Sequence, residues 1–541
     1  MCGYLLQHLL EHSARKYPDN VAVVFKEKSV TYSELEQQSN DLARKLQQSG
    51  IKKGDRVGIM LSKSIETIVS LFGILKSGAI YVPIDPSAPV NRITYIIKHC
   101  GIECLIASSP NLNTLLSDSE EQMSVTKAIV VGKDHDESRH LNILAECLPF
   151  YQVSDNGDSE FQSVEMSDSS PAYILHTSGS TGNPKGVAIS HLNALTFVEM
   201  AARFFKISET DRFCNHAPLH FDLSVFDIFV AVKCGAAIVL LPELLSTFPV
   251  KLSEFIAKEQ ITIWNSVSSV LTMLADKGML ERHSFDALRI VHFSGDIMPA
   301  KYLRVLTKHM GNASFFNIYG QTEANSSMFY PIGELPDDDA WRIPIGRPFP
   351  NFEVFALNDA GEVISRVGED GELYVGSSTV ALGYWGEEWM TGDKFVPDPR
   401  YPVSRKIVYK TGDLVRIDGH GNYVFSGRKD NMVKSRGYRI ELEEIETVLS
   451  SHPEIMAAVV LPIPDELVGN RIVAVIVPMS NRTVGKEDVV RHCATRLPKY
   501  MMPEIMEFRD SLPMTSSGKI DRKTLAGICA GNYRHSQEDS V

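Results

Sequence analysis

The chain has 541 residues, of which 44% are hydrophobic and 22% are charged. This length exceeds what one hydrophobic core can organise, so two or more domains are expected. A net charge of −13 argues against a nucleic-acid partner, which would require a basic face. No apolar run approaches the roughly 18 residues of a membrane helix, and no leader peptide is evident. We therefore expect a cytoplasmic protein without a membrane or nucleic-acid partner.

Eight cysteines are scattered along the chain, and only Cys100 and Cys104 lie close together in sequence. A zinc site needs a second pair or a histidine cluster, and the sequence pattern supplies neither. The simpler interpretation is a set of free thiols in a reducing compartment.

Short apolar runs typical of strands alternate with helical patterns. They occupy residues 21–25, 56–61, 79–84, 104–108 and 128–132, and later residues 236–241, 261–264, 288–293 and 314–319. Between the first two runs, Thr31 and Glu34 form a capping-box pattern, and Gly50 follows the helical stripe at the position of a C-terminal cap. The alternation predicts an α/β fold with largely parallel sheets, whose ligand sites lie at the carboxyl ends of the strands.

The composition changes after Phe425. A polar turn at residues 427–431 precedes a helical pattern at 441–450, strand-like runs at 457–461 and 472–477, and a second helical pattern at 486–497. We expect a large N-terminal domain of mixed and parallel sheets flanked by helices (residues 1–428). A small C-terminal α/β domain follows (residues 429–541). The last dozen residues, from Cys529, have little apolar content and are expected to be frayed.

The segment at residues 175–187, LHTSGSTGNPKGV, contains four hydroxyl residues, three glycines and one lysine. Glycine allows close backbone approach, consecutive N–H groups form an anion-binding concavity, and Lys185 adds a point charge. The spacing fits neither a Walker A loop nor a dinucleotide fingerprint. A flexible surface loop is disfavoured, because a strand-like run precedes the segment and a helical pattern follows from His191. The pattern predicts a polyphosphate site.

This segment resembles the phosphate loop of the adenylate-forming superfamily, which contains the acyl- and aminoacyl-AMP ligases. Further segments match that superfamily in its order and cover nearly the whole chain: residues 75–85, 221–226, 317–323, 371–376, 409–416, 427–430, 435–441 and 517–522. The resemblance implies an enzyme that uses ATP and Mg²⁺ to convert a carboxylic acid into an acyl-AMP with release of pyrophosphate.

The resemblance also implies roles for residues around the nucleotide. The phosphates would be held by Thr177, Ser178, Gly179, Ser180, Thr181, Gly182 and Lys185. Glu323 would bind Mg²⁺, and Thr322 would contact the α-phosphate. Gly295 and Asn317 would lie beside the nucleoside. Tyr319 would stack on adenine, and Asp413 would bind the ribose with Arg428 beside it. Without the resemblance, each of these residues has a simpler interpretation. Glu323 would be a solvated carboxylate, Tyr319 a core aromatic and Asp413 part of a turn.

Lys519 lies near the end of the small domain, in the pattern SSGKIDR. By resemblance it bridges the substrate carboxylate and the α-phosphate during adenylation and matters much less for the second half-reaction. This division of labour requires the small domain to be mobile and to rotate about a hinge, which matches Asp430. Residues 435–441, with Gly437, would then face a phosphopantetheine thiol.

The substrate class depends on Asp222, in the pattern FDLS. In amino-acid-activating members an aspartate here receives the α-ammonium group, a charged hydrogen bond that contributes about 1.5–3 kcal/mol. The alternative is a helix-capping aspartate. By position in the family, the side-chain pocket would be lined by Leu223, Phe226, Asn265, His292, Ser294, Ile318, Ser326 and Ser327. Asp222, Leu223, Phe226 and Asn265 are similar to proline-activating pockets, whereas His292 and the two serines depart from that pattern. Proline ranks first, with alanine or another small residue next.

Alternative functions remain open at this stage. The segments around Phe221 and Phe293 are also similar to D-alanine–carrier protein ligases, and Gln321 is a residue common in acyl-CoA ligases, so acyl- or aryl-CoA synthesis is a rival. A catalytically silent binding module is a third reading. No carrier segment follows Lys519, which predicts a freestanding enzyme that acts on a phosphopantetheinylated carrier protein in trans.

Overall fold

The computed structural model describes residues 3–118, 124–132, 146–150, 161–179, 182–339, 341–401, 403–479, 484–513 and 520–538. Of the residues named above, Ser180, Thr181 and Lys519 lie outside this part of the chain. Strands occur at every predicted apolar run, so the predicted α/β class is confirmed. Thr31 and Glu34 form the predicted capping box at the start of α2.

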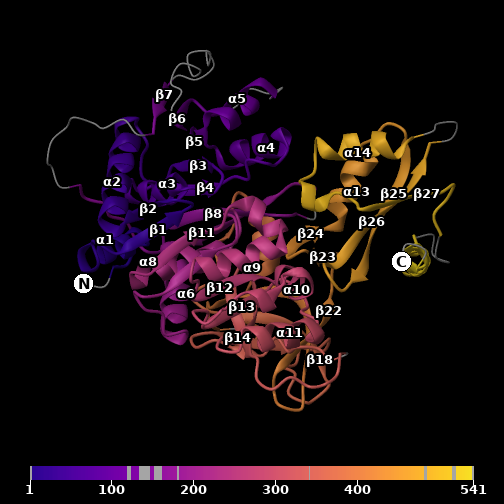
Figure 1. Cartoon of the computed structure of the whole chain (residues 1–541). Coiled ribbons are helices and arrows are strands. Elements are labelled where there is room, and N and C mark those ends of the chain that lie inside the picture. Colours follow the sequence, from indigo (N-terminus) through magenta and orange to yellow (C-terminus); the bar gives the residue numbers. More distant parts are fainter. Residues whose placement is uncertain are drawn as a thin grey trace.

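The large domain contains two mainly parallel sheets (Figure 1). The first has the order β16 (Arg347–Pro348), β15 (Asn325–Pro331), β14 (Ser314–Gln321), β13 (Ile290–Ser294), β12 (Ile263–Val267), β10 (Arg212–Asn215), β11 (Ala237–Leu240), β1 (Val21–Phe25) and β2 (Lys28–Thr31). The second has the order β19 (Gly383–Tyr384), β9 (Lys185–Ser190), β8 (Pro171–Thr177), β4 (Ile80–Pro83), β3 (Arg56–Met60), β5 (Cys104–Ser108), β6 (Lys127–Val131) and β7 (Glu146–Pro149).

Helices cover these sheets. In chain order they are α1 (Gln7–Lys16), α2 (Tyr32–Gln48), α3 (Ile65–Lys76), α4 (Val90–Cys100), α5 (Ser109–Asp118), α6 (His191–Phe204), α7 (Leu223–Val225), α8 (Ala231–Cys234), α9 (Pro249–Lys258), α10 (Ser268–Lys277) and α11 (Ala300–His309). Helix α3 contacts β3 and β4 of the second sheet and β1 of the first. Its residues are buried almost all round, as expected of a helix packed between layers.

A third, antiparallel sheet completes the large domain. Its strands are β17 (Glu353–Leu357), β18 (Asp370–Gly376), β21 (Ile407–Ile417) and β20 (Phe395–Pro397), with β22 (Tyr423–Arg428) paired to β21 and α12 (Glu388–Lys394) before β20. The β21–β22 register sets Asp413 opposite Arg428. The chain leaves this sheet at Arg428 and enters the small domain at Met432.

The small domain begins with the hairpin β23 (Met432–Ser435) and β24 (Tyr438–Glu441). A sheet of β25 (Ile455–Asp465), β26 (Gly469–Pro478) and β27 (Ile505–Phe508) follows, with helices α13 (Leu442–Ser450) and α14 (Lys486–Ala494). One hydrophobic cluster joins these two helices to the sheet, and a separate cluster joins the sheet to the C-terminal helix.

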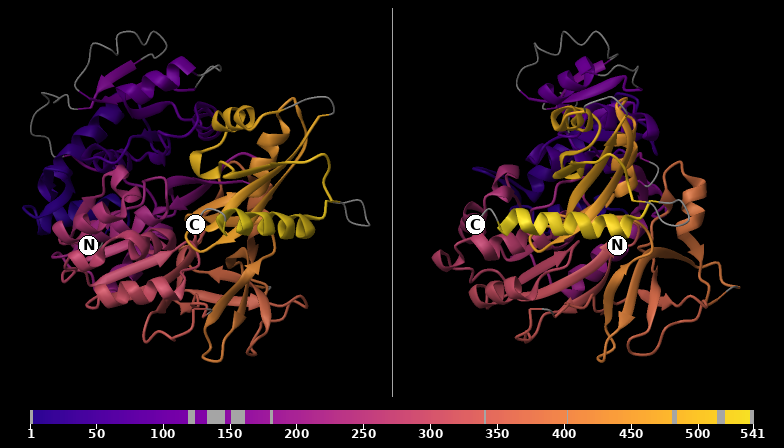
Figure 2. Two further views of the ribbon diagram at one scale, coloured as in Figure 1. Left: turned by 45° about the vertical axis from the view of Figure 1, so that its right-hand side comes forward. Right: turned by 90° about the vertical axis from the view of Figure 1, so that its right-hand side faces the viewer.

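The expectation of a frayed C-terminus is wrong. Residues Arg522–Glu538 form helix α15, drawn in yellow across the small-domain sheet in Figure 2. Leu525 and Cys529 are four residues apart and therefore share one helix face, and both are buried against strands β25 and β26. A low overall apolar content concealed this short stripe.

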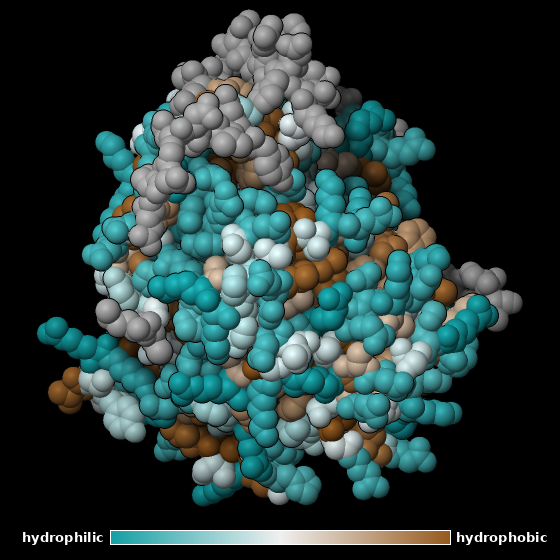
Figure 3. Space-filling view, turned by 60° about the vertical axis from the view of Figure 1, so that its left-hand side comes forward, coloured by the Kyte–Doolittle hydropathy of each residue, from teal (hydrophilic) through white to brown (hydrophobic). Residues whose placement is uncertain are grey.

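Among the described residues, no helix is both long and apolar enough to cross a membrane. On the face shown in Figure 3, hydrophilic side chains dominate and hydrophobic ones form small scattered groups.

Candidate active site

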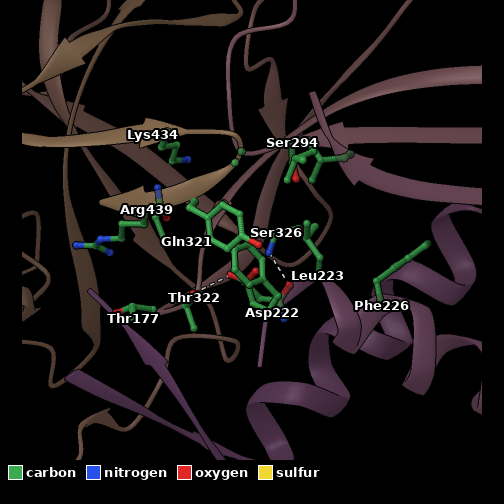
Figure 4. Close-up of a pocket in the computed structure, with 18 of the residues that line it drawn as sticks. Thr177, Asp222, Leu223, Phe226, Ser294, Gln321, Thr322, Ser326, Lys434 and Arg439 are labelled. Carbon is green, nitrogen blue, oxygen red and sulfur yellow. Dashed lines mark hydrogen bonds between the residues drawn. The ribbon is translucent and has the colours of Figure 1, made fainter. Parts of the chain in front are cut away.

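Two adjoining cavities lie at the carboxyl ends of the parallel strands, where the small domain meets the large one. The first has a volume of about 130 Å³, and the second about 330 Å³. They share wall residues, including Gly295 and Asp413 from the large domain and Lys434 from the small one. Figure 4 shows Lys434 and Arg439 of the small-domain hairpin facing Asp222 and Leu223 of the large domain across the first cavity. A site of this kind is completed by domain docking.

The first cavity contains most of the residues predicted for the substrate side chain. Its lining includes Asp222, Leu223, Phe226, Asn265, His292, Ser294, Ile318 and Ser326. Ser327 differs from the expectation, because it does not line this cavity: it is fully buried and its hydroxyl donates to the Tyr319 carbonyl at 3.4 Å. Side chains alternate between the two faces of a strand, so neighbouring residues of β15 do not both face the cavity.

Asp222 is held by a side chain rather than by a helix end. Its carboxylate accepts a hydrogen bond of 2.8 Å from the Thr322 hydroxyl, drawn as a dashed line in Figure 4. Although it precedes α7, its side chain makes no capping hydrogen bond. Burial raises the pKa of the Asp222 carboxyl, and the Thr322 hydrogen bond opposes that rise. The geometry therefore does not support the capping interpretation, and the carboxylate is available to a ligand.

The floor of the cavity is aromatic. The His292 ring centroid lies 4.1 Å from that of Phe205 and 4.8 Å from that of Phe226. Burial lowers the pKa of His292 to about 3, so the ring is neutral at pH 7. Asn265 beside it donates hydrogen bonds to Asp227, at 3.1 Å, and to the Leu223 carbonyl, at 3.3 Å. A neutral, rigid floor suits a small and mainly apolar side chain.

Sequence reasoning missed part of this wall. Phe197 on α6, Phe205 directly after α6, and Phe349 also line the cavity. They lie outside every motif. Apolar residues at helical spacing, such as those of α6, are ordinarily interpreted as part of the hydrophobic core. Phe205 contacts His292, Phe316 and Phe349, so this wall is set by tertiary packing, which no local pattern encodes.

The second cavity is lined by the residues expected around the nucleoside: Gly295, Asn317, Tyr319, Asp413 and Arg428. Asp413 accepts hydrogen bonds from the Tyr319 hydroxyl and from Arg428. Gln321 donates to the same carboxylate at 3.0 Å. Asn317 donates to the Pro344 carbonyl at 2.8 Å. The carboxylate is thus fixed in place by three donors from two sheets.

The predicted phosphate loop joins β8 to β9, with Thr177 paired to Lys185 in register. Close packing requires its glycines: a Cβ added at Gly179 would lie 2.1 Å from the Asn183 carbonyl oxygen, and Gly182 has a φ of +87°. Among the described residues the buried Thr177 hydroxyl has no hydrogen-bond partner. Glycine-rich turns with free donors form anion-binding concavities.

Lys185 and Glu323 form a buried charged group with Tyr384 and Arg439. The Tyr384 hydroxyl donates to Glu323 at 2.7 Å, Arg439 donates to the same oxygen at 3.0 Å, and the Lys185 ammonium lies 3.6 Å from it. Burial alone would raise the pKa of Glu323, but Arg439 and Lys185 lower it to about 2. Burial and the nearby Arg439 lower the pKa of Lys185 to about 8. Glu323 is therefore ionised at neutral pH.

The small domain docks directly on the phosphate loop. The Ser178 hydroxyl donates to the Arg439 carbonyl at 2.8 Å, and the Gly179 N–H donates to Glu444 at 3.2 Å. Glu444 also pairs with Arg92 at 2.5 Å. Two loop residues are thereby occupied by small-domain groups in this orientation.

Gly437 lies at a point of close approach between the domains. Its φ is +78°, and an added Cβ would lie 2.2 Å from Val267 Cγ1. An added Cβ at Gly295 would in turn lie 3.3 Å from the Gly437 Cα. Asp430, the predicted hinge, pairs with Arg428 through the Nε atom at 2.5 Å. A side chain at Gly437 would therefore clash with Val267 unless the docked domains moved apart.

Comparison with known families identifies the chain. A family model described as AMP-binding enzyme matches residues 10–385, and one described as AMP-binding enzyme C-terminal domain matches residues 444–519. The chain belongs to the AMP-binding enzyme family. Membership of this family implies that the protein uses ATP. It also confirms the resemblance inferred from the ordered motifs.

This AMP-binding enzyme is 35% identical to the L-proline–[L-prolyl-carrier protein] ligase of Pseudomonas fluorescens, over 96% of its own length and 99% of the relative's. It is 32% identical to zwittermicin A synthase ZmaJ of Bacillus cereus, over 98% of its own length and 96% of the relative's. Bacitracin synthase 1 of Bacillus licheniformis is 35% identical over 96% of this chain, which corresponds to only 9% of that much longer protein.

Among solved structures, the amide bond synthetase McbA from Marinactinospora thermotolerans matches with a TM-score of 0.84 and 25% identity, covering 97% of this chain and 99% of that one. The Vibrio cholerae adenylation domain AlmE has the same fold, with a TM-score of 0.82 at 22% identity, covering 98% of each chain. The two-domain architecture is therefore that of adenylate-forming enzymes.

Proposed function

We propose that this AMP-binding enzyme converts an amino acid, proline in preference, into aminoacyl-AMP and transfers it to the phosphopantetheine thiol of a separate carrier protein. The observation that carries the proposal is Asp222, a half-buried carboxylate in the wall of the cavity with the aromatic floor. Desolvation raises the pKa of its carboxyl, so a cation bound beside it would stabilise the ionised form. The α-ammonium group of an amino acid supplies that cation.

Proline is favoured over other amino acids by two observations. The cavity floor, built from Phe205, Phe226 and a neutral His292, suits a compact apolar ring. A relative that matches this chain almost end to end is named L-proline–[L-prolyl-carrier protein] ligase. Alanine, in either stereochemical form, or another small residue is the next candidate.

In the adenylation step a substrate carboxylate oxygen attacks the α-phosphorus of ATP, and the bond to pyrophosphate breaks. Two anions must meet, so positioning and fixed positive charge supply most of the catalysis. Thr177, Ser178, Gly179, Gly182 and Lys185 hold the leaving phosphates, with Ser180 and Thr181 completing the loop. Asp413 holds the ribose and Tyr319 the adenine, with Asn317 and Gly295 beside them.

Glu323 is the proposed ligand for Mg²⁺. Its carboxylate is fully buried and ionised, with a pKa of about 2, and hard oxygen ligands of this kind suit Mg²⁺. Magnesium bound there would neutralise charge on the polyphosphate. In the present orientation Arg439 donates to both Glu323 oxygens, at 3.0 and 3.3 Å. Metal binding and this docking of the small domain therefore compete for one carboxylate.

This competition supports a two-orientation mechanism. Glu323 would hold Mg²⁺ and the loop the polyphosphate only with Arg439 displaced, and Lys519 would then bridge the substrate carboxylate and the α-phosphate. After pyrophosphate leaves, the small domain would turn at Asp430 and dock through Gly437 and Arg439. We assign the described orientation, in which Arg439 contacts Glu323, to thioester formation.

A third cavity, of about 420 Å³, offers a path for the thiol. It lies between the domains, lined by His216 and Val270 of the large domain and Arg436 and Val468 of the small one. It shares Phe221, Leu223, Val267 and Tyr438 with the amino-acid cavity. A phosphopantetheine arm entering there arrives beside Asp222.

Coenzyme A is the rival thiol. Gln321, the residue that suggested it, donates to Asp413 here, so its role in fixing the ribose carboxylate accounts for it without coenzyme A. We expect labelled proline to become attached to a phosphopantetheinylated carrier protein and not to the same carrier lacking the arm. Thioester formation with coenzyme A alone would overturn the carrier-loading proposal.

Replacing Asp222 with asparagine is expected to raise the KM for the amino acid by about 10–100-fold, because a charged hydrogen bond contributes about 1.5–3 kcal/mol. The asparagine keeps an acceptor for Thr322, so the KM for ATP should stay within about threefold. ATP–pyrophosphate exchange measures both. An unchanged amino-acid KM would refute the ammonium-binding role.

Replacing Glu323 with glutamine is expected to raise the Mg²⁺ concentration for half-maximal exchange by at least about 10-fold, since a neutral amide is a poor ligand for a hard cation. Tyr384→Phe is the matched control: it removes one hydrogen bond to Glu323 but no charge, and should shift the Mg²⁺ requirement much less. Equal Mg²⁺ requirements in Glu323→Gln and the unaltered enzyme would exclude Glu323 as the metal ligand.

A further inference from the structure

A cluster of soft metal ligands lies behind the phosphate loop. His99 and Cys100 form the C-terminal end of α4, and His176 lies on β8 immediately before Thr177. One ligand atom from each of the three residues lies within 4.8 Å of the other two. The sequence pattern predicted no zinc site because His176 is 76 residues away from Cys100. The fold brings them together.

We propose that His99, Cys100 and His176 bind a divalent zinc ion, with Glu387 as a fourth ligand. Imidazole nitrogen, thiolate sulfur and carboxylate oxygen are the donors that zinc takes in proteins. Three protein ligands come from α4 and β8, and the fourth precedes α12.

The distances suit a tetrahedral ion. The Cys100 Sγ lies 3.7 Å from the His176 Nε2. Zinc with bond lengths of about 2.3 Å to sulfur and about 2.0–2.1 Å to nitrogen separates such atoms by about 3.6 Å in tetrahedral geometry. The His99 Nε2 lies 3.8 Å from the Glu387 Oε1. The ligand atoms of His99, Cys100 and His176 lie within 4.8 Å of one another, and they would have to move closer together to reach these bond lengths.

The histidines carry unused nitrogen atoms. Within the described residues, the buried Nδ1 of His176 has no hydrogen-bond partner, and the ring nitrogens of His99 have only loose contacts, with the Trp385 backbone and with Glu387 at 3.8 Å. A buried polar atom without a partner costs about 1–3 kcal/mol. Coordination of a metal ion satisfies such atoms.

The surroundings admit a cation. The two nearby guanidinium groups already have partners, because Arg92 pairs with Glu444 and Arg56 donates to the carbonyl oxygens of Cys100 and Gly101. The His99 side chain is 13% exposed and that of Glu387 is 44% exposed. An ion therefore has a route from solvent along these two residues.

The position of the cluster gives the ion a structural role. It would tie the end of α4 to β8 and to the turn before α12. His176 adjoins Thr177 of the phosphate loop, and Tyr384, three residues before Glu387, contacts both Lys185 and Glu323. Zinc binding would thus fix two segments that support the polyphosphate site.

The test uses the full-length protein titrated with Co²⁺ alone and then with Zn²⁺. We expect one equivalent of Co²⁺ to produce a thiolate-to-cobalt charge-transfer band, which Zn²⁺ removes by displacement. Cys100→Ser should abolish the band, and His99→Gln, at the most exposed histidine of the cluster, should weaken Co²⁺ binding by at least about 100-fold. Loss of even an outer partner of a metal ligand typically costs about 10–100-fold.

Cys493→Ser is the control, because Cys493 is a buried thiol of α14 in the small domain. The charge-transfer band of this variant should equal that of the unaltered protein. Thermal unfolding measured without metal shows that each variant is folded. Absence of the band in the unaltered protein, or an equal band in the folded Cys100→Ser variant, would overturn the proposal.

Discussion

Replacing Lys519 with alanine is expected to lower amino-acid-dependent ATP–pyrophosphate exchange by at least about 100-fold. Loss of one fixed donor to developing charge typically costs about 10²–10³ in rate, and Lys519 is proposed to bridge the two anions that react. Thioester formation from preformed aminoacyl-AMP should change by less than about threefold, because in the described orientation the small domain presents Gly437 and Arg439 to the site instead.

Lys523→Ala is the matched control for that experiment. Lys523 is an exposed lysine at the start of α15, close to Lys519 in sequence, and its removal should leave both half-reactions unchanged. If Lys519→Ala slows exchange and thioester formation equally, a single orientation of the small domain serves both steps and the rotating-domain account is wrong.

Replacing Gly437 with alanine should have the opposite effect. The added Cβ would lie 2.2 Å from Val267 Cγ1, and forced overpacking of this kind costs about 1–3 kcal/mol. The cost falls only on the orientation described here. We expect thioester formation from preformed aminoacyl-AMP to slow by about 10–100-fold, while ATP–pyrophosphate exchange stays within about threefold.

Part of any effect at Gly437 comes from its backbone, since its φ is +78°. Gly421→Ala separates this contribution, because Gly421 has a φ of +76° and open space where the Cβ would lie. It should leave both half-reactions unchanged. Equal slowing of exchange and thioester formation in Gly437→Ala would mean that the contact with Val267 is not specific to one step.

The parallel strands and the phosphate loop could be predicted because their signals are local. Apolar runs of strand length, the Thr31 capping box and the glycine-rich segment each act over a few residues. The ordered motifs then supplied the family, which no periodicity alone could give. The C-terminal helix was missed because, in the part of it whose burial is described, only Leu525 and Cys529 are fully buried apolar side chains, too few to change the composition of the segment.

The aromatic wall, the docking contacts and the histidine–cysteine cluster could not be predicted, because each joins segments that are distant in sequence. Phe205 meets His292 through tertiary packing, and Arg439 reaches Glu323 across the domain interface. Asp222 lies between these cases. Its identity was recognised from a motif, but its partner Thr322 and its lack of a capping role became clear only in three dimensions.

The central claim is that this enzyme activates an amino acid, with proline preferred. ATP–pyrophosphate exchange, measured with each of the common amino acids, D-alanine and several fatty and aryl acids, tests it most directly. The account predicts the highest kcat/KM with proline, weaker exchange with alanine or other small residues, and none with fatty or aryl acids. Exchange that depends only on a fatty or aryl acid would contradict it.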